Sequence, residues 1–114
     1  MRNIYIVNAL QIVVSDQNPQ GVLSTVPNYP KNFDSRSYKA TEENPNGDEE
    51  IALLAAQAEF SAEIVTLATA NNANRVGWSV SITRGSDGKQ LYFKSFGGFP
   101  DMTPTPEPET DESI

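Results

Sequence analysis

Two carboxylates, Glu59 and Glu63, stand one helical turn apart in the segment EEIALLAAQAEFSAEIVTLATA, which spans positions 49–70. This spacing places both on one face of a helix, where a carboxylate pair can bind a cation or exchange protons with a substrate. Acidic pairs four residues apart are also common on solvated helix flanks, and no third carboxylate follows at ligand spacing. We therefore predict no catalytic or metal site from this pair.

The side chains that most often carry catalysis or bind transition metals are missing from this chain. It has no His and no Cys, which removes the commonest general base, the commonest metal ligand and any thiolate nucleophile. It contains no phosphate-binding loop, dinucleotide fingerprint, nucleophile elbow or zinc-ligand spacing. The acidic stretch NPNGDEE at 44–50 does not match the spacing of an EF-hand calcium loop. We therefore expect a protein that is not an enzyme and uses no cofactor.

The second half of the chain combines aromatic and basic side chains, which together can stack single-stranded bases. Trp78, however, alternates with Val80 and Ile82, which predicts that it packs in the core. A net charge of -7 also argues against duplex nucleic acid, because neutralising phosphates requires clustered Lys and Arg. We expect a protein partner instead. The aromatic and basic residues in question are Trp78, Tyr92, Phe93, Phe96, Lys89 and Lys94.

Three segments have the patterns of β-strands. Residues 3–15 are apolar on both sides of a period-two pattern, which predicts either a central strand or a strand whose second face is covered by a partner. The segment RVGWSVSIT at 75–83 alternates large apolar residues with Gly, Ser and Thr, which predicts a strand with one Ser-lined face. The turn GSDG at 85–88 and the segment QLYFKSF at 90–96 complete a β-hairpin.

A long helix is predicted from Asp48 to about Ala70. Asp48 is a suitable N-cap, and Glu49 and Glu50 complement the positive end of the helix dipole. The Asn pair at 71–72 is expected to end the helix.

Residues 16–47 contain four prolines with Asn and Gly between them, which excludes a long helix and permits only short extended pieces. The segment is either an ordered Pro-rich arm packed by its aromatic residues or a long binding loop, and the arm can pack on its own domain or on a neighbour. We expect residues 1–100 to form a single domain. Residues 101–114 are expected to be an acidic tail rich in Pro and Thr.

The predicted helix carries two apolar stripes. At about 100° per residue, the first stripe is rich in Ala and permits close approach to a sheet, whereas the second has larger side chains that need a pocket. A small sheet covers only one stripe, so the other must be covered by the arm, by another copy or by a different partner. The first stripe is Ile51, Leu54, Ala55, Ala58, Ala62 and Val65. The predicted partner-interface residues are Leu53, Phe60, Ile64 and Leu67 of the second stripe, with Tyr29, Phe33 and Tyr38 of the arm.

The sequence predicts an α+β fold, in which the long N-terminal strand and the C-terminal hairpin form a small antiparallel or mixed sheet packed on one long helix. We expect a non-catalytic structural or interaction subunit that assembles with itself or into a larger complex. An accessory protein of a phage or virus particle is one example. The alternative is a small acidic inhibitor or decoy that binds a basic site on another protein.

No stretch reaches the roughly 18 to 20 uninterrupted apolar residues that are typical of a membrane span. The N-terminal segment MRNIYIVNALQIVVSD is interrupted by Asn and Gln and shows no clear cleavage site for a signal peptide. We therefore expect a soluble protein without a membrane partner, either cytoplasmic or associated with a particle.

Overall fold

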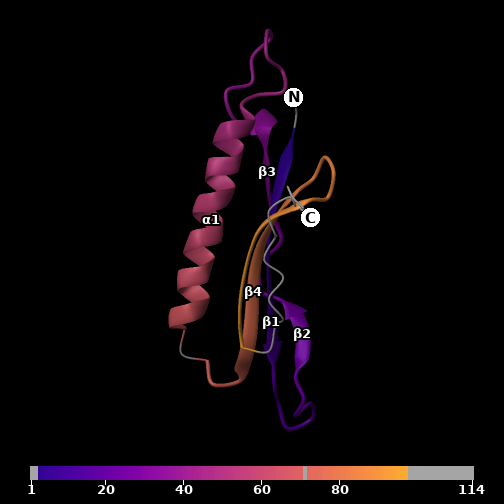
Figure 1. Ribbon diagram of the computed structural model, residues 1–114, viewed down its shortest axis with the longest axis vertical. Coiled ribbons are helices and arrows are strands. Elements are labelled where there is room, and N and C mark those ends of the chain that lie inside the picture. Colours follow the sequence, from indigo (N-terminus) through magenta and orange to yellow (C-terminus); the bar gives the residue numbers. More distant parts are fainter. Residues whose placement is uncertain (1–2, 71, 98–114) are drawn as a thin grey trace, which may run out of the picture.

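The computed structural model describes residues 3–70 and 72–97. In this part of the chain, five strands form one sheet and a single long helix covers one of its faces (Figure 1). The predicted α+β fold is confirmed, and every described strand pair is antiparallel. The predicted acidic tail at 101–114 lies outside the described residues.

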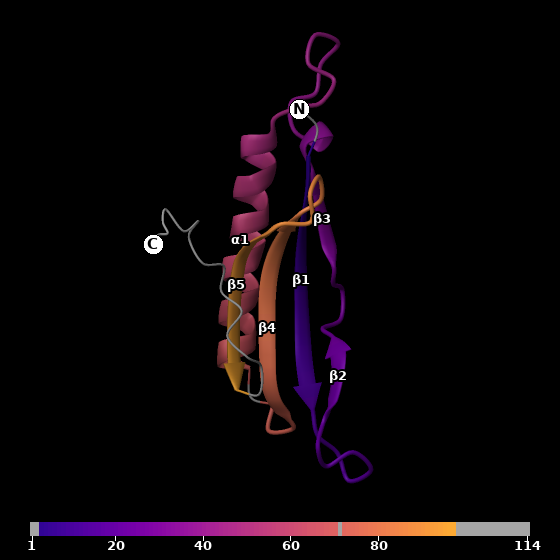
Figure 2. The ribbon, with the colours of Figure 1, turned by 45° about the vertical axis from the view of Figure 1, so that its right-hand side comes forward.

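The sheet is built around β1 (Ile4–Val13), which has neighbours on both sides. On one side lie β4 (Arg75–Arg84) and then β5 (Gln90–Gly97). On the other side, β3 (Lys31–Asp34) pairs with residues 4–7 of β1 and β2 (Val22–Thr25) pairs with residues 10–13. The two short strands therefore lie end to end along one edge of the sheet, as Figure 2 shows.

The Pro-rich segment 16–47 contributes β2, β3 and the 3-10 helix η1 (Ser35–Ser37). Two strands of four residues agree with the prediction of short extended pieces. They widen the expected sheet from three strands to five. The additional strands lie at the edge of the sheet. Prolines are tolerated beside an edge strand, because a missing backbone N–H there does not interrupt the hydrogen bonds in the centre of the sheet.

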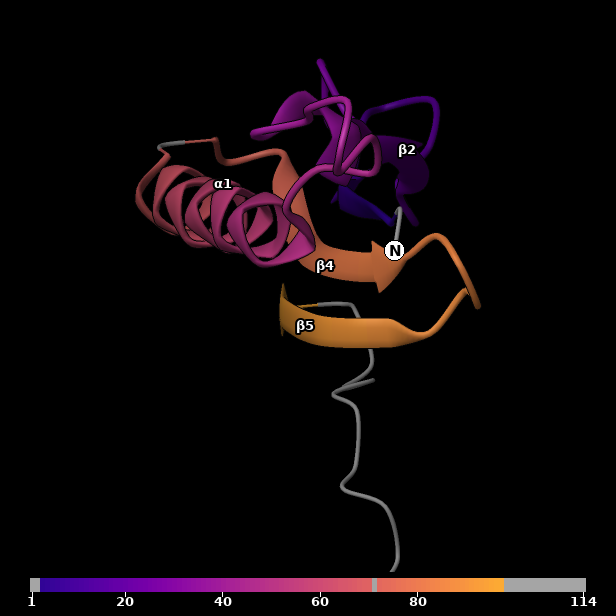
Figure 3. The ribbon, with the colours of Figure 1, turned by 90° about the horizontal axis from the view of Figure 1, so that it is seen from above.

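The helix α1 (Glu49–Thr69) begins where the sequence predicted. The side chain of Asp48 accepts a hydrogen bond from the backbone N–H of Ile51 at 3.1 Å, which satisfies one donor of the first turn. Glu49 and Glu50 occupy that first turn. The helix then runs along the sheet on one side only, as the view from above in Figure 3 shows.

The larger apolar stripe of α1 faces the sheet, which reverses the expected orientation. Ala52 and Ala56 are fully buried in the middle of this inward side and allow the helix backbone to approach the strands. Leu54 and Val65 of the Ala-rich stripe are instead 63% and 61% exposed. The expectation failed because a sequence pattern cannot show which alanines meet a sheet. The inward side also carries four larger residues of the predicted interface, Leu53, Phe60, Ile64 and Leu67.

A buried serine joins three segments near the start of the helix. Ser35 is fully buried, and its hydroxyl accepts from the Asn3 N–H at 2.9 Å and donates to the carbonyl of Asn46 at 2.7 Å. Gly47 has a φ of +74°, and a Cβ there would lie 1.8 Å from the Ser35 carbonyl oxygen. Residue 47 must therefore be glycine for the helix to start against η1 and the first residues of the chain.

By length and composition alone, α1 is apolar enough to cross a membrane, and 17% of the most apolar window is buried. In the structure this helix packs along the sheet and contacts β1, β3 and β4. Its outer side is largely exposed. That the protein has no membrane partner stays a prediction.

Candidate functional site

The two faces of the sheet differ in what covers them. The face beneath α1 is the core, where Val7, Ala9, Val80 and Ile82 have no exposed surface. Cross-strand registers place these residues side by side, with Val7 opposite Ile82 and Ala9 opposite Val80. Trp78 lies on the same face and is 6% exposed, as its alternation predicted.

The opposite face, here called the open face, is apolar along its centre and is covered by no helix or strand of the described residues. Alternation along β1 turns four large side chains toward it, and all four are only half-buried. Leu23 on β2 lies opposite Ile12, and Phe93 on β5 lies opposite Ser81, so both belong to this face. The apolar residues of the open face are Ile4, Ile6, Leu10, Ile12, Leu23 and Phe93.

The sequence builds this face from two different patterns. The strand β1 has apolar residues at both odd and even positions, so whichever side the helix covers, the other stays apolar. Its neighbour β4 contributes small residues, since Ser81 lies opposite Asn8 and Ser79 opposite Leu10. A ridge of Ile and Leu is therefore flanked by short side chains that leave it accessible.

A shallow hollow of about 370 Å³ lies at the β3 end of the open face. Its lining combines residues of β1 and β3 with the turn between β4 and β5, and the Gly85 N–H donates to the Ile4 carbonyl at 2.7 Å there. Two of its polar members, Asn32 and Ser86, are exposed. The residues that line the hollow are Asn3, Ile4, Ile6, Asn32, Gly85 and Ser86.

The carboxylate pair is occupied by the arm. The hydroxyl of Tyr29 hydrogen-bonds Glu59 and lies 3.0 Å from Glu63 Oε1. Lys31 Nζ lies 3.0 Å from Glu59 Oε2. Burial, and then the bonds to both carboxylates, raise the pKa of Tyr29, while the Tyr29 bond and the Lys31 ammonium lower the pKa of Glu59. These contacts hold β3 and the residues just before it against the helix.

A second polar contact fixes the other flank of α1. Gln57 Nε2 donates to the Tyr92 hydroxyl at 2.6 Å, and the Tyr92 ring packs against Phe60 with the ring centroids 5.9 Å apart. The flanking polar residues of the helix therefore bond to opposite edges of the sheet, β3 and β5. This pairing fixes the rotation of the helix and hence which stripe points inward.

The aromatic and basic residues of the hairpin do not form one stacking surface. Trp78 is buried under the helix, Tyr92 is bonded to Gln57, and Phe93 points to the opposite face from Phe96. Phe96 stacks on Trp78 with centroids 6.1 Å apart. Because these side chains are distributed over both faces of the sheet, they give no support to nucleic-acid binding.

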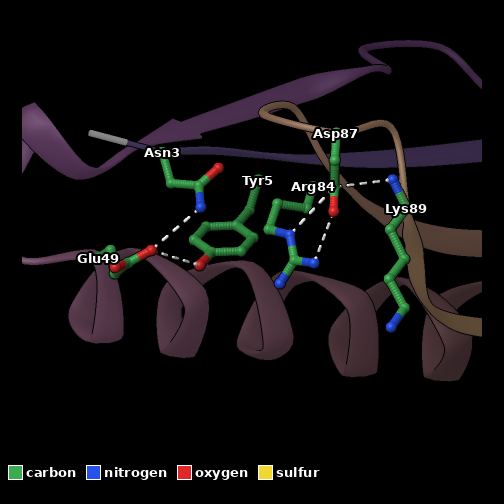
Figure 4. Close-up of polar contacts among 6 residues, drawn as sticks. All are labelled: Asn3, Tyr5, Glu49, Arg84, Asp87 and Lys89. Atoms are coloured by element: carbon green, nitrogen blue, oxygen red, sulfur yellow. Dashed lines mark hydrogen bonds and ion pairs between the residues drawn. The ribbon is translucent and has the colours of Figure 1, made fainter. Parts of the chain in front are cut away.

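Near the start of α1, Glu49 accepts hydrogen bonds from Asn3 Nδ2 at 3.0 Å and from the Tyr5 hydroxyl at 3.2 Å (Figure 4). Burial, followed by the nearby Glu49 charge, raises the pKa of Tyr5. Arg84 pairs with Asp87 at 2.8 Å within the hairpin turn and lowers the Asp87 pKa to about 2. The six residues drawn form two separate hydrogen-bonded clusters, one around Glu49 and one around Asp87, and Asn3 Oδ1 is buried without a hydrogen-bond partner among the described residues.

The structure places the seven predicted interface residues in or against the core of the chain itself. Leu67 belongs to the buried core, and the other six are partly buried against it. The arm therefore packs on its own domain. That any of these residues contacts a partner stays a prediction. The six are Leu53, Phe60, Ile64, Tyr29, Phe33 and Tyr38.

Sequence reasoning recognised β1 as apolar on both sides but did not select its second face as the site. The signal was the pattern of 4–13, which places apolar residues on both sides of the strand although Asn8 and Gln11 interrupt it. Within the described residues, no group of three or more Asp or Glu side chains could hold a metal ion. No protein-family model, curated protein or solved structure matches this chain.

Proposed function

We propose that this protein is a non-catalytic structural or interaction subunit that assembles with itself or into a larger complex. The observation that carries the proposal is the open face: a five-stranded sheet with its second face apolar and covered by none of the described elements. Contiguous apolar surface of this kind commonly marks a protein interface. A phage or virus particle accessory protein remains one example of such a subunit.

The hydrogen bonds of the candidate carboxylates support the expectation of a non-catalytic role. Glu59 and Glu63 are bonded by Tyr29 and Lys31, so the pair stabilises the fold. Glu49 is bonded by Asn3 and Tyr5 in the same way. These arrangements use the carboxylates as hydrogen-bond acceptors between elements.

The solution mass of the purified chain tests the proposal, measured by light scattering over a concentration series at low and high salt. Assembly through apolar surface predicts an oligomer that persists at high salt, because burial of uncharged groups is little affected by ionic screening. A strict monomer that acquires no protein partner would contradict the proposal.

The alternative function, an acidic inhibitor or decoy of a basic site, draws support from a cluster of acids beside the helix start. Glu42, Glu43 and Glu50 are exposed there, and Asp48 and Glu49 are close by in the chain. Such a protein would remain a monomer alone and would bind a basic partner in a complex that weakens steeply with salt. The same salt series therefore separates the two functions.

A further inference from the structure

We infer that the partner of the open face is a second copy of this chain, seated face to face with its β1 strand antiparallel to the first. This inference rests on the proposed function and names the surface and the partner through which the subunit assembles. The two sheets would form the inner layers of a four-layer arrangement, with one α1 helix on each outer side.

Charge argues against a basic foreign partner for the open face. The chain carries a net charge of -7, so copies repel one another except where a surface is neutral. Asp34, opposite Ile4, is the single charged residue that the strand registers place on the open face among the described residues. A largely apolar face with one acid is less repulsive to a like-charged copy than the rest of the surface, whereas recognition of a basic partner would need several acids here.

The size of the face is also sufficient. The strand β1 has ten residues, which at about 3.3 Å per residue span about 33 Å. Four strand positions across the sheet, about 4.8 Å apart, add a width of about 19 Å. Two such faces bury about 1,200 Å² together, the lower end of the range of stable protein interfaces.

Shape then determines the direction of packing. Leu23 is 60% exposed at the end of the face where it lies opposite Ile12, and this exposed side chain is here called the protrusion. The hollow beside Asn32 lies at the other end, where Asn32 is opposite Ile6. Along β1 the two ends are separated by six residues, or about 20 Å. A protrusion and a hollow on one face are complementary when two copies pack around a two-fold axis perpendicular to β1.

Charge substitutions on matched, exposed leucines test this arrangement. Leu23→Asp places a carboxylate at the protrusion, while Leu54→Asp places one on the outer side of α1, where the exposed fraction is 63%. Light scattering over a concentration series gives the dimer dissociation constant, and thermal unfolding by circular dichroism verifies folding. We expect Leu23→Asp to raise the constant by about 100-fold, because burying a carboxylate is costly, and Leu54→Asp to change it less than about threefold. Leu23→Ser serves if the charged variant does not fold.

A paired substitution tests the antiparallel seating itself. Leu23→Lys alone should weaken the dimer, and adding Asn32→Asp in the same chain should restore at least about tenfold of the loss, because each lysine then meets the aspartate of the other copy. The two positions lie at opposite ends of the open face, about 20 Å apart in one chain, so the lysine and the aspartate cannot pair within that chain. Absence of rescue would overturn the antiparallel seating.

The outcomes separate this inference from the proposed function. An oligomer that Leu54→Asp dissociates and Leu23→Asp does not would overturn the inference while assembly stands. A wild-type chain that is monomeric at every concentration would overturn both the inference and self-assembly.

Discussion

The two sides of the central strand β1 are alike in composition but differ in how far they are buried. On the helix side, Val7 and Ala9 are fully buried against β4 and α1. On the open side, Ile6 and Leu10 are equally apolar but only half-buried. The difference shows that an apolar strand pattern indicates that a face needs to be buried. It does not indicate whether the burying layer belongs to the same chain.

The largest expected effect comes from removing the cover on the helix side. Replacing Phe60 and Ile64 with Ser should lower the free energy of unfolding by about 4 kcal/mol, because both pack against the core beneath α1. Urea unfolding followed by circular dichroism measures this change. The matched control replaces Leu54 and Val65, which are exposed on the outer side of the same helix, with Ser and should cost less than about 1 kcal/mol. Equal losses in the two double variants would contradict the assigned orientation of the helix.

A matched pair of isoleucines compares the two faces directly. Ile82→Ala should cost about 3 kcal/mol of unfolding free energy, because Ile82 is fully buried. Ile6→Ala, on the open face, should cost about 1 kcal/mol in dilute protein but should weaken self-association as well. Both substitutions replace Ile with Ala in a paired strand, so the loss of strand propensity is the same in the two variants and cancels in the comparison. If Ile6→Ala destabilises the dilute monomer as much as Ile82→Ala does, the open face is covered within the chain.

The carboxylate contact with the arm should give the helix side a pH dependence. Tyr29 and Lys31 lower the pKa of Glu59 in the folded chain, so this contribution is present above the usual Glu pKa of about 4.3 and is lost as pH falls through the lowered value. Glu59→Gln should lower the unfolding free energy at pH 7 by about 1 kcal/mol and flatten the fall of Tm below about pH 4.3. Glu43→Gln, at an exposed loop position outside the helix, is the control. A Glu59→Gln profile parallel to that of the wild type would disprove the contribution.

The smallest effect sharpens the comparison on the open side. Ser81 lies between Asn8 of β1 and Phe93 of β5 on the open face, and Ser81→Val adds apolar area there. If a second copy buries that area, the dimer dissociation constant should fall by about fivefold, while the unfolding free energy of the dilute monomer changes by less than about 0.5 kcal/mol. Concentration-dependent light scattering measures the first quantity and urea unfolding the second. An unchanged dissociation constant would show that residue 81 lies outside the interface.

Much of the fold followed from local patterns in the sequence. The Asp48 cap fixed the helix start, and the alternation of 75–83 predicted both the strand and the burial of Trp78. The two strands of the arm were not predictable in type or number, because four-residue segments such as VLST and KNFD carry too little pattern and depend on β1 for their hydrogen bonds.

The candidate site was predictable only in part. The second apolar face of β1 was visible in the sequence, but the helix stripes were assigned in the wrong order. Ala52 and Ala56, which approach the sheet, do not differ in type from the exposed Ala58 and Ala62. The contacts that set the helix rotation join Tyr29 to Glu59 and Gln57 to Tyr92, and such long-range pairs leave no local signal.

Cysteine labelling tests most directly whether a second copy covers the open face. Because the chain has no Cys, Leu10→Cys and Leu54→Cys each introduce one thiol, on the open face and on the outer side of α1. The alkylation rate of each is measured across a dilution series. Coverage by a second copy predicts that the thiol at 10 reacts slowly in concentrated protein and faster on dilution, while the thiol at 54 reacts at a constant rate. A constant, rapid rate at position 10 in concentrated protein would contradict that coverage.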